Sequence, residues 1–113
     1  MDLNLDLNIE QKRAMASVLI DIINADGQIH DGEKKYLKQV RKSLKIDKKD
    51  MQEALNMSVI DSLNIIKDMN NFQKQAFSYM MQEMIKADGE VDSRETDVYV
   101  TVCTAADIAV NPV

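Results

Sequence analysis

Two stretches of the chain decide its fold, because they place the same acidic turn after the same kind of helix. Residues 22–33 read IINADGQIHDGE, and residues 84–95 read MIKADGEVDSRE. Each stretch contains an Ala-Asp-Gly sequence that interrupts an apolar pattern, and Gly is the residue that best tolerates the left-handed backbone that ends a helix. The sequence therefore predicts a helix, a turn and a second helix, twice.

The repeat extends well beyond the turns. Asp26 and Asp88 are 62 positions apart, and the same offset aligns Glu33 with Glu95. Apolar residues also match ahead of the turns, with Ala14, Met15, Val18, Leu19, Ile22 and Ile23 aligned on Ala76, Phe77, Met80, Met81, Met84 and Ile85. Two pseudo-symmetric helix-turn-helix units explain this match, each burying half of one core.

Apolar residues spaced three and four apart predict about six helices and no strand. We expect the first two helices over about 9–25 and 31–45. A third is capped by Asp47 or Asp50 and carries Met51, Ala54 and Leu55. The fourth is capped by Ser58, with Val59, Ile60, Leu63, Ile66 and Met69 on its apolar face.

The last two helices follow the second half of the repeat. The fifth opens at Asn70-Asn71, has Phe72, Ala76, Phe77, Met80, Met81, Met84 and Ile85 as its apolar face, and stops at Asp88-Gly89. The sixth holds Val98, Tyr99, Val102, Cys103 and Ala106, and Pro112 marks the end of the ordered chain. At 113 residues, the chain fits one all-α domain, a compact helical bundle, with residues 1–8 as a flexible leader.

The charge balance restricts the partners. A formal net charge of −5 argues against nucleic acids and anionic membrane surfaces, and favours cations or basic proteins. The lone Cys103 excludes an internal disulfide, and no apolar run approaches the roughly 20 residues of a membrane span. We expect a cytoplasmic protein without direct membrane insertion; the oligomeric state stays open.

The acidic turns are candidates for binding a divalent cation. Neither fits an EF-hand. In the first copy the first ligand position would be Ile22, which has no ligand oxygen, although Asn24 is at the third; in the second copy these positions would be Met84 and Lys86. Another geometry stays open, since an acid also precedes each turn by about one helical turn. The candidate ligands are Asp21, Asp26, Glu33, Glu83, Asp88 and Glu95, oxygen donors that suit calcium, magnesium or manganese.

The same acids have a local explanation. An Asp can bond the backbone of its own turn, and Asp92 with Glu95 has the spacing of an N-cap and its capping-box partner. The remaining polar candidates favour ordinary structural roles: His30 as a solvated turn residue and Cys103 as a small buried side chain. The lysines and arginines between Lys34 and Lys49 are read as a solvated basic face that balances the acidic turns.

The two turns, their flanking acids and the helical pattern resemble the TerB family of tellurite-resistance proteins. Residues 84–95 carry the resemblance most closely, and residues 22–33 carry it with His30 and Gly32 as departures. The resemblance implies a compact bacterial helical bundle linked to tellurium resistance and envelope stress, with no catalytic activity. It also implies a suspected metal-binding role for Asp26, Glu33, Asp88 and Glu95, all of which are present here.

Two functional hypotheses follow. In the first, the chain is a non-catalytic module of the stress response that binds a divalent cation at its Asp-Gly turns. In the second, it is a protein-interaction adaptor whose acids are only helix caps and surface charge. An enzyme is disfavoured because the sequence contains no nucleophile–base pair, phosphate loop or cofactor motif.

Overall fold

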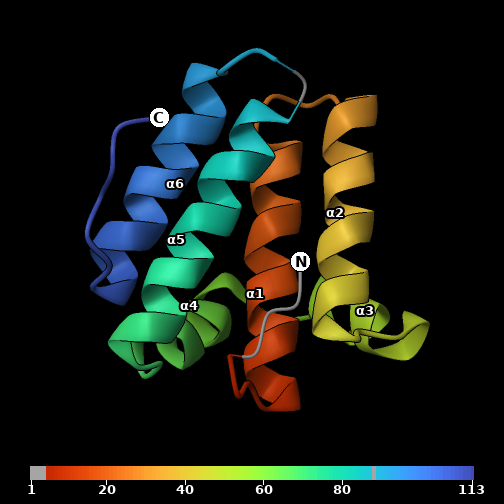
Figure 1. Ribbon diagram of the computed structural model, residues 1–113, viewed down its shortest axis with the longest axis vertical. Coiled ribbons are helices and arrows are strands. Elements are labelled where there is room, and N and C mark those ends of the chain that lie inside the picture. Colours follow the sequence, from red (N-terminus) through yellow and green to blue (C-terminus); the bar gives the residue numbers. More distant parts are fainter. Residues whose placement is uncertain (1–4, 88) are drawn as a thin grey trace.

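The protein is a bundle of α-helices, seen in a computed structural model that describes residues 5–87 and 89–113 (Figure 1). The helices of the described chain are α1 (Ile9–Asn24), α2 (Asp31–Leu44), α3 (Lys48–Leu55), α4 (Val59–Lys67), α5 (Asn71–Lys86) and α6 (Ser93–Ala106). The predicted all-α class is confirmed, and the predicted helix boundaries differ from these by one or two residues at most.

Capping side chains explain where the helices begin. Asn8 precedes α1 and Asn70 precedes α5, and each accepts a hydrogen bond from the backbone N–H of a glutamine three residues on, at 2.8 Å in both copies. Asp47 and Ser58 accept equivalent bonds at the starts of α3 and α4. Such caps satisfy backbone donors that a helix leaves unpaired at its first turn.

The repeat also determines where the helices end. Gly27 and Gly89 follow α1 and α5 with φ values of 77° and 85°. After α2 and α6, Lys45 and Asp107 close the helices in the left-handed conformation, with φ of 56° and 58°. These two residues are again 62 positions apart. The predicted pseudo-symmetry is therefore present in the backbone and runs from the N-cap of the first helix of each unit to the C-cap of the second.

Helix α1 is the centre of the bundle, in contact with each of the other five helices. The two repeats cross, since α1 contacts α6 and α5 contacts α2. Figure 1 shows α5 and α6 on one side of α1 and α2 on the other. The shared core contains Met80, Met81 and Met84, each fully buried, as the helical spacing predicts.

Some apolar residues assigned to helix faces lie outside the core, which corrects the sequence prediction. Leu55, Val59, Ile60 and Phe72 are between 55% and 72% exposed. Helix α4 buries only Ser62 and Ile66, so its first turn projects past the core. In the first turn of α5 the buried residues are Gln73 and Lys74 instead of Phe72, because their polar ends reach backbone carbonyls.

The chain is packed on the bundle both before α1 and after α6. Leu5, in the segment where the sequence predicts a flexible leader, is buried, and its carbonyl accepts a hydrogen bond of 2.8 Å from Nε2 of Gln73. Residues 1–4 of that segment lie outside the described residues. After α6, the N–H of Ile108 bonds the carbonyl of Cys103 at 2.8 Å, and that of Asn111 bonds the Tyr99 hydroxyl at 3.1 Å. The chain after Ala106 therefore runs back along the bundle.

Among the described residues, none of the helices combines the length and apolarity that crossing a bilayer requires.

Candidate metal centre

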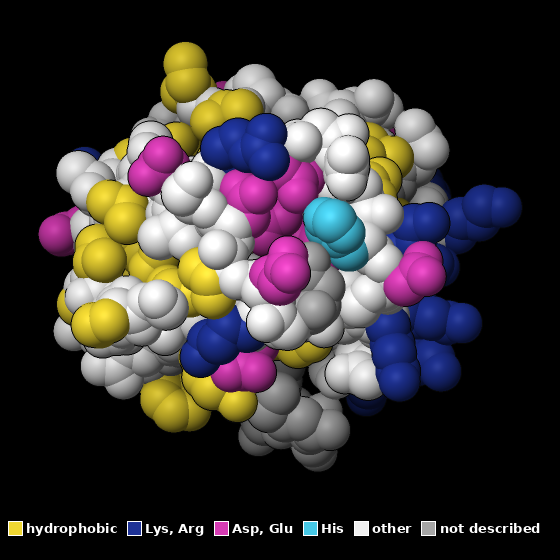
Figure 2. Space-filling view, turned by 90° about the horizontal axis from the view of Figure 1, so that it is seen from above, with side chains coloured by type: hydrophobic (Ala, Val, Ile, Leu, Met, Phe, Trp, Pro, Cys, Tyr) yellow, Lys and Arg dark blue, Asp and Glu magenta, His cyan; other side chains and the backbone are white. Residues whose placement is uncertain are grey.

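The two acidic turns meet at one end of the bundle. The α1–α2 and α5–α6 connections lie side by side there (Figure 1). Seen from that end, acidic side chains gather near the centre of the face, bordered by the single histidine and by a basic side chain (Figure 2). The pseudo-symmetry thus brings equivalent acids of the two repeats into one cluster.

The first turn is closed by Asp26. Its Oδ1 accepts a hydrogen bond of 2.9 Å from the N–H of Gln28, and its Oδ2 lies 3.1 Å from Nε2 of His30. These two interactions lower the pKa of Asp26, with the Gln28 bond as the larger cause. The local role predicted for this acid is confirmed, and its carboxylate, only 5% exposed, is held in the ionised form.

Glu33 and Glu95 form the buried part of the cluster. They lie in the first turns of α2 and α6, at equivalent positions of the two repeats. Their exposed fractions are 0% and 2%. Oε1 of Glu33 accepts a bond of 3.2 Å from the N–H of His30. Within the described structure, Oε2 of each glutamate is buried without a hydrogen-bond partner. Such orphaned oxygens are rare in folded proteins, because burying a carboxylate without partners costs free energy.

The two glutamates act on each other. The pKa of Glu95 is raised to about 8, first by burial and then by its hydrogen bond and charge interaction with Glu33; Asp26 and Asp92 add smaller effects of the same sign. Carboxylates from both turns therefore interact in one place, and at neutral pH one glutamate of the pair retains a proton. We call Asp26, Glu33, Asp92 and Glu95 the acidic cluster.

Two basic side chains border the acidic cluster. Arg94 pairs with Asp92 at 3.1 Å and lies close enough to Asp26 and Glu95 for their charges to raise its pKa. His30 was expected to be a solvated turn residue, but its ring contacts Asp26 and is only 38% exposed. The negative charge of the cluster is thus partly neutralised on its solvent-facing side. Its buried side consists of the two glutamates.

Comparison with known proteins relates this chain to a protein family. A family model described as "Tellurite resistance protein TerB" matches residues 1–56. The chain belongs to a TerB-like family. Searches of curated proteins and of solved structures gave no match. The matched region contains α1, α2 and the first acidic turn, so in this TerB-like chain the second turn, at residues 84–95, is related to the first by the internal repeat.

The remaining candidate ligands lie elsewhere or outside the description. Asp21 is exposed. Partial desolvation of its carboxyl group raises its pKa, and no charged neighbour contributes to this shift. Glu83 pairs with Lys86 at 3.8 Å and lies beside Tyr36 of α2, whose pKa is raised to about 12 by burial and then by this carboxylate. Asp88 lies outside the described residues. Of the six sequence candidates, three therefore belong to the acidic cluster: Asp26, Glu33 and Glu95.

Asp92 is not among the ligand candidates that the sequence predicts. Its spacing to Glu95 predicts the N-cap of the last helix, and this cap is present, since Asp92 Oδ1 accepts a hydrogen bond of 2.8 Å from the N–H of Arg94. Its proximity to Asp26 across the two turns depends on the tertiary arrangement. The internal repeat could have indicated that Asp92 lies at the site. The residue aligned with Asp92 in the first turn is His30, and His30 contacts Asp26.

The cluster can hold a proton or attract a cation. Among residues 5–87 and 89–113, no three His, Cys, Asp or Glu side chains are already arranged around one metal position. The two orphaned oxygens nevertheless fit a hard cation, which prefers carboxylate oxygen and would neutralise both charges at once. Cys103, the other reactive group of this TerB-like chain, is buried in the core, and burial raises the pKa of its thiol. Its expected role as a small core side chain is confirmed.

Proposed function

We propose that this TerB-like chain is a non-catalytic cytoplasmic module, associated with tellurite resistance or stress, that binds one divalent cation between its two acidic turns. The observation that carries the proposal is the pair Glu33 and Glu95, which are buried, interact with each other and have one orphaned oxygen each. Asp26 and Asp92 supply further oxygen atoms from the two turns.

The physical reason is that two buried carboxylates need a compensating charge. A single shared proton removes one of the two negative charges, whereas a divalent cation removes both and coordinates the orphaned oxygens. All four groups are hard oxygen donors, so calcium, magnesium and manganese are preferred over zinc. Among the described residues the carboxylates are not yet gathered around one point, so binding has to draw them together.

The proposal is tested by thermal unfolding of the chelator-treated protein at pH 7.5, with and without millimolar calcium, magnesium or manganese. A ligand bound only by the folded state adds RT ln(1 + [L]/Kd), or about 2.7 kcal/mol at one hundred times Kd. We expect at least one ion to raise the melting temperature, and we expect Glu33→Gln and Glu95→Gln to remove that rise.

Asp97→Asn is the matched control, because Asp97 is an exposed acid on the same helix as Glu95. This variant makes the same carboxyl-to-amide change as Glu95→Gln and should keep the full response. No shift with any of the three ions, or an equal loss of the shift in the control, would reject the cation module.

The second candidate is a protein-interaction adaptor, and one observation favours it. Asp26 and Asp92 both cap their own turns, through the N–H groups of Gln28 and Arg94, so local bonding already uses these acids. In an adaptor the acidic end and the basic α2 face would bind partners of opposite charge. This candidate predicts no cation response and a protein complex that weakens as salt rises from 50 to 300 mM.

A further inference from the structure

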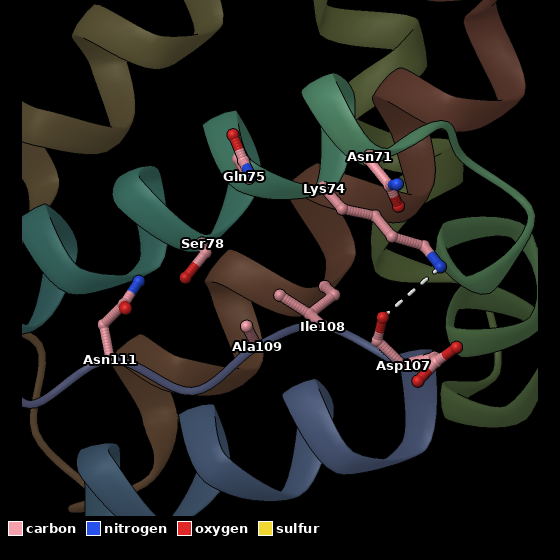
Figure 3. Close-up of a pocket in the computed structure, with 8 residues that line it drawn as sticks. All are labelled: Asn71, Lys74, Gln75, Ser78, Asp107, Ile108, Ala109 and Asn111. Atoms are coloured by element: carbon pink, nitrogen blue, oxygen red, sulfur yellow. Dashed lines mark hydrogen bonds between the residues drawn. The ribbon is translucent and has the colours of Figure 1, made fainter.

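A second polar site lies on another part of the molecule, between α5 and the chain that follows α6. It is a cavity of about 390 Å³, within the size range of small-molecule sites. Asn71, Lys74, Gln75 and Ser78 of α5 form one wall, and residues 107–111 form the other (Figure 3). Lys74 precedes the end of α5 by 12 residues, which is about 18 Å along a helix. The cavity is therefore separate from the acidic cluster.

Lys74 is the charged group of this cavity. The residue is only 9% exposed, and its Nζ donates a long hydrogen bond, 3.4 Å, to the backbone carbonyl of Asp107. In Figure 3 the side chain of Asp107 points away from Ala109 and Asn111, on the far side of its own backbone. No carboxylate of the described residues lies within ion-pair distance of Nζ. A largely buried ammonium normally has an anionic partner.

The wall opposite α5 is held in place. The N–H of Asn111 donates to the Tyr99 hydroxyl at 3.1 Å, and that hydroxyl is 2.8 Å from Oγ of Ser78 on α5. At the other end, Lys74 holds the carbonyl of Asp107. Because both ends of the segment are tied to α5 or α6, the cavity between them exists before any ligand arrives, which lowers the entropic cost of binding.

The first repeat shows how the equivalent face of a helix is completed. There α3 packs on α1, and Asp50 of α3 accepts two hydrogen bonds from Arg13 of α1, at 2.6 and 3.0 Å. In the second repeat Gln75 stands at the position of Arg13 at the offset of 62, while Lys74 aligns with Lys12. Arg13 of α1 is thus paired with an internal carboxylate, an arrangement that α5 lacks, and Lys74 of α5 lines a cavity instead.

We propose that this cavity binds a small organic anion, whose carboxylate or phosphate group pairs with Lys74. Three side-chain amides, those of Asn71, Gln75 and Asn111, line the same cavity and can donate to the anion or bond the polar remainder of the molecule. Lys74 lies in the first turn of α5, so the positive end of the helix dipole also favours an anion bound beside it.

The test is a titration of the full chain, labelled with ¹⁵N, with inorganic phosphate in one arm and succinate in the other, at constant ionic strength. We expect saturable shifts of the Asn71, Gln75 and Asn111 side-chain amides with at least one anion, and the arm that saturates identifies phosphate or carboxylate as the recognised group. Lys74→Met, which keeps the aliphatic stem, should weaken binding at least tenfold, and Lys74→Arg should preserve most of it.

Lys67→Met is the matched control, because Lys67 is an exposed lysine at the end of α4, and it should bind as the unaltered chain does. If Lys74→Met fails to fold, Asn111→Ala serves instead and should weaken binding, since the bond of Asn111 to Tyr99 is made by its backbone N–H, which alanine keeps. Absence of saturable shifts in both arms, or equal affinities in Lys67→Met and Lys74→Met, overturns the proposal.

Discussion

Glu33 and Glu95 stand at equivalent positions of the two repeats, and their buried carboxyl groups interact with each other across the end of the bundle. Burial and the interaction with Glu33 raise the pKa of Glu95 from an ordinary 4.5 to about 8. The folded protein therefore holds a proton that the unfolded chain releases near pH 4.5. Below that pH both states are protonated, so the penalty develops between pH 4.5 and 8, where stability falls as pH rises.

The first prediction is that Glu95→Gln removes this loss in the metal-free protein. Glutamine resembles the neutral carboxyl group and does not ionise, so the variant should gain stability relative to the unaltered chain as pH rises from 5 to 8. Each unit of pKa shift corresponds to 1.36 kcal/mol, so a difference of a few kcal/mol is expected at pH 8. Urea unfolding at several pH values, with chelator present, measures it.

Asp97→Asn provides the comparison for that experiment, because its exposed acid should change stability by a similar amount at every pH. If Glu95→Gln and the unaltered chain give parallel curves over pH 5–8, the buried pair does not titrate as described.

The helices could be predicted from the sequence because their signals are local. Apolar spacing, the caps at Asp47 and Ser58, and the glycines at 27 and 89 each act within a few residues. The exposure of Phe72 and Ile60 could not be predicted, since both fit an apolar helix face. Only the packing shows that the first turn of α4 projects past the core and that polar side chains take the buried positions in the first turn of α5. At the site, the equivalence of Glu33 and Glu95 could be predicted from the repeat. The closeness of Asp92 to Asp26, near enough for its charge to act on the pKa of Asp26, depends on how the two turns meet.

A second prediction separates the acids of the acidic cluster from the other sequence candidates. Asp21→Asn and Glu83→Gln should leave any cation-induced rise in melting temperature unchanged, because Asp21 is exposed and Glu83 is paired with Lys86. Glu33→Gln should abolish the same rise. Thermal unfolding with the ion that gives the largest response measures all three. A response lost in Asp21→Asn or Glu83→Gln would extend the site to the preceding helical turns.

The third prediction concerns two isoleucines of α4 that look alike in sequence. Ile66 is fully buried and Ile60 is 72% exposed. Ile66→Ala should lower the free energy of unfolding by about 2–4 kcal/mol, because it removes buried methyl groups and leaves a cavity. Ile60→Ala should change it by less than about 0.5 kcal/mol. Urea unfolding at neutral pH compares them, and a large cost at Ile60 would mean that this residue is covered in solution.

The fourth prediction tests the backbone of the turns. Gly27 and Gly89 have positive φ values, and a Cβ at either position would meet no atom within 4 Å. Alanine should therefore cost about 1–2 kcal/mol through backbone strain alone. Gly27→Asn should cost less than Gly27→Ala, because asparagine adopts the left-handed conformation more readily. Equal losses for the two variants in urea unfolding would point to a contact at this position instead.

The last prediction concerns the ion pair that ties α3 to α1. Arg13 Nη2 lies 2.6 Å from Oδ1 of Asp50, and the hydrogen bond from Arg13 is the largest cause of the lowered pKa of Asp50. A carboxylate with a lowered pKa contributes stability above its ordinary pKa of 3.8, and that contribution is lost as pH falls through the lower folded value. Arg13→Met and Asp50→Asn should thus both destabilise the protein at pH 7, and the double variant should lose less than the sum of the two. Urea unfolding of the four proteins at pH 7 gives the coupling energy, which should shrink when the cycle is repeated near pH 3. Additive losses at pH 7 would show that α3 is held to α1 by apolar packing without help from this pair.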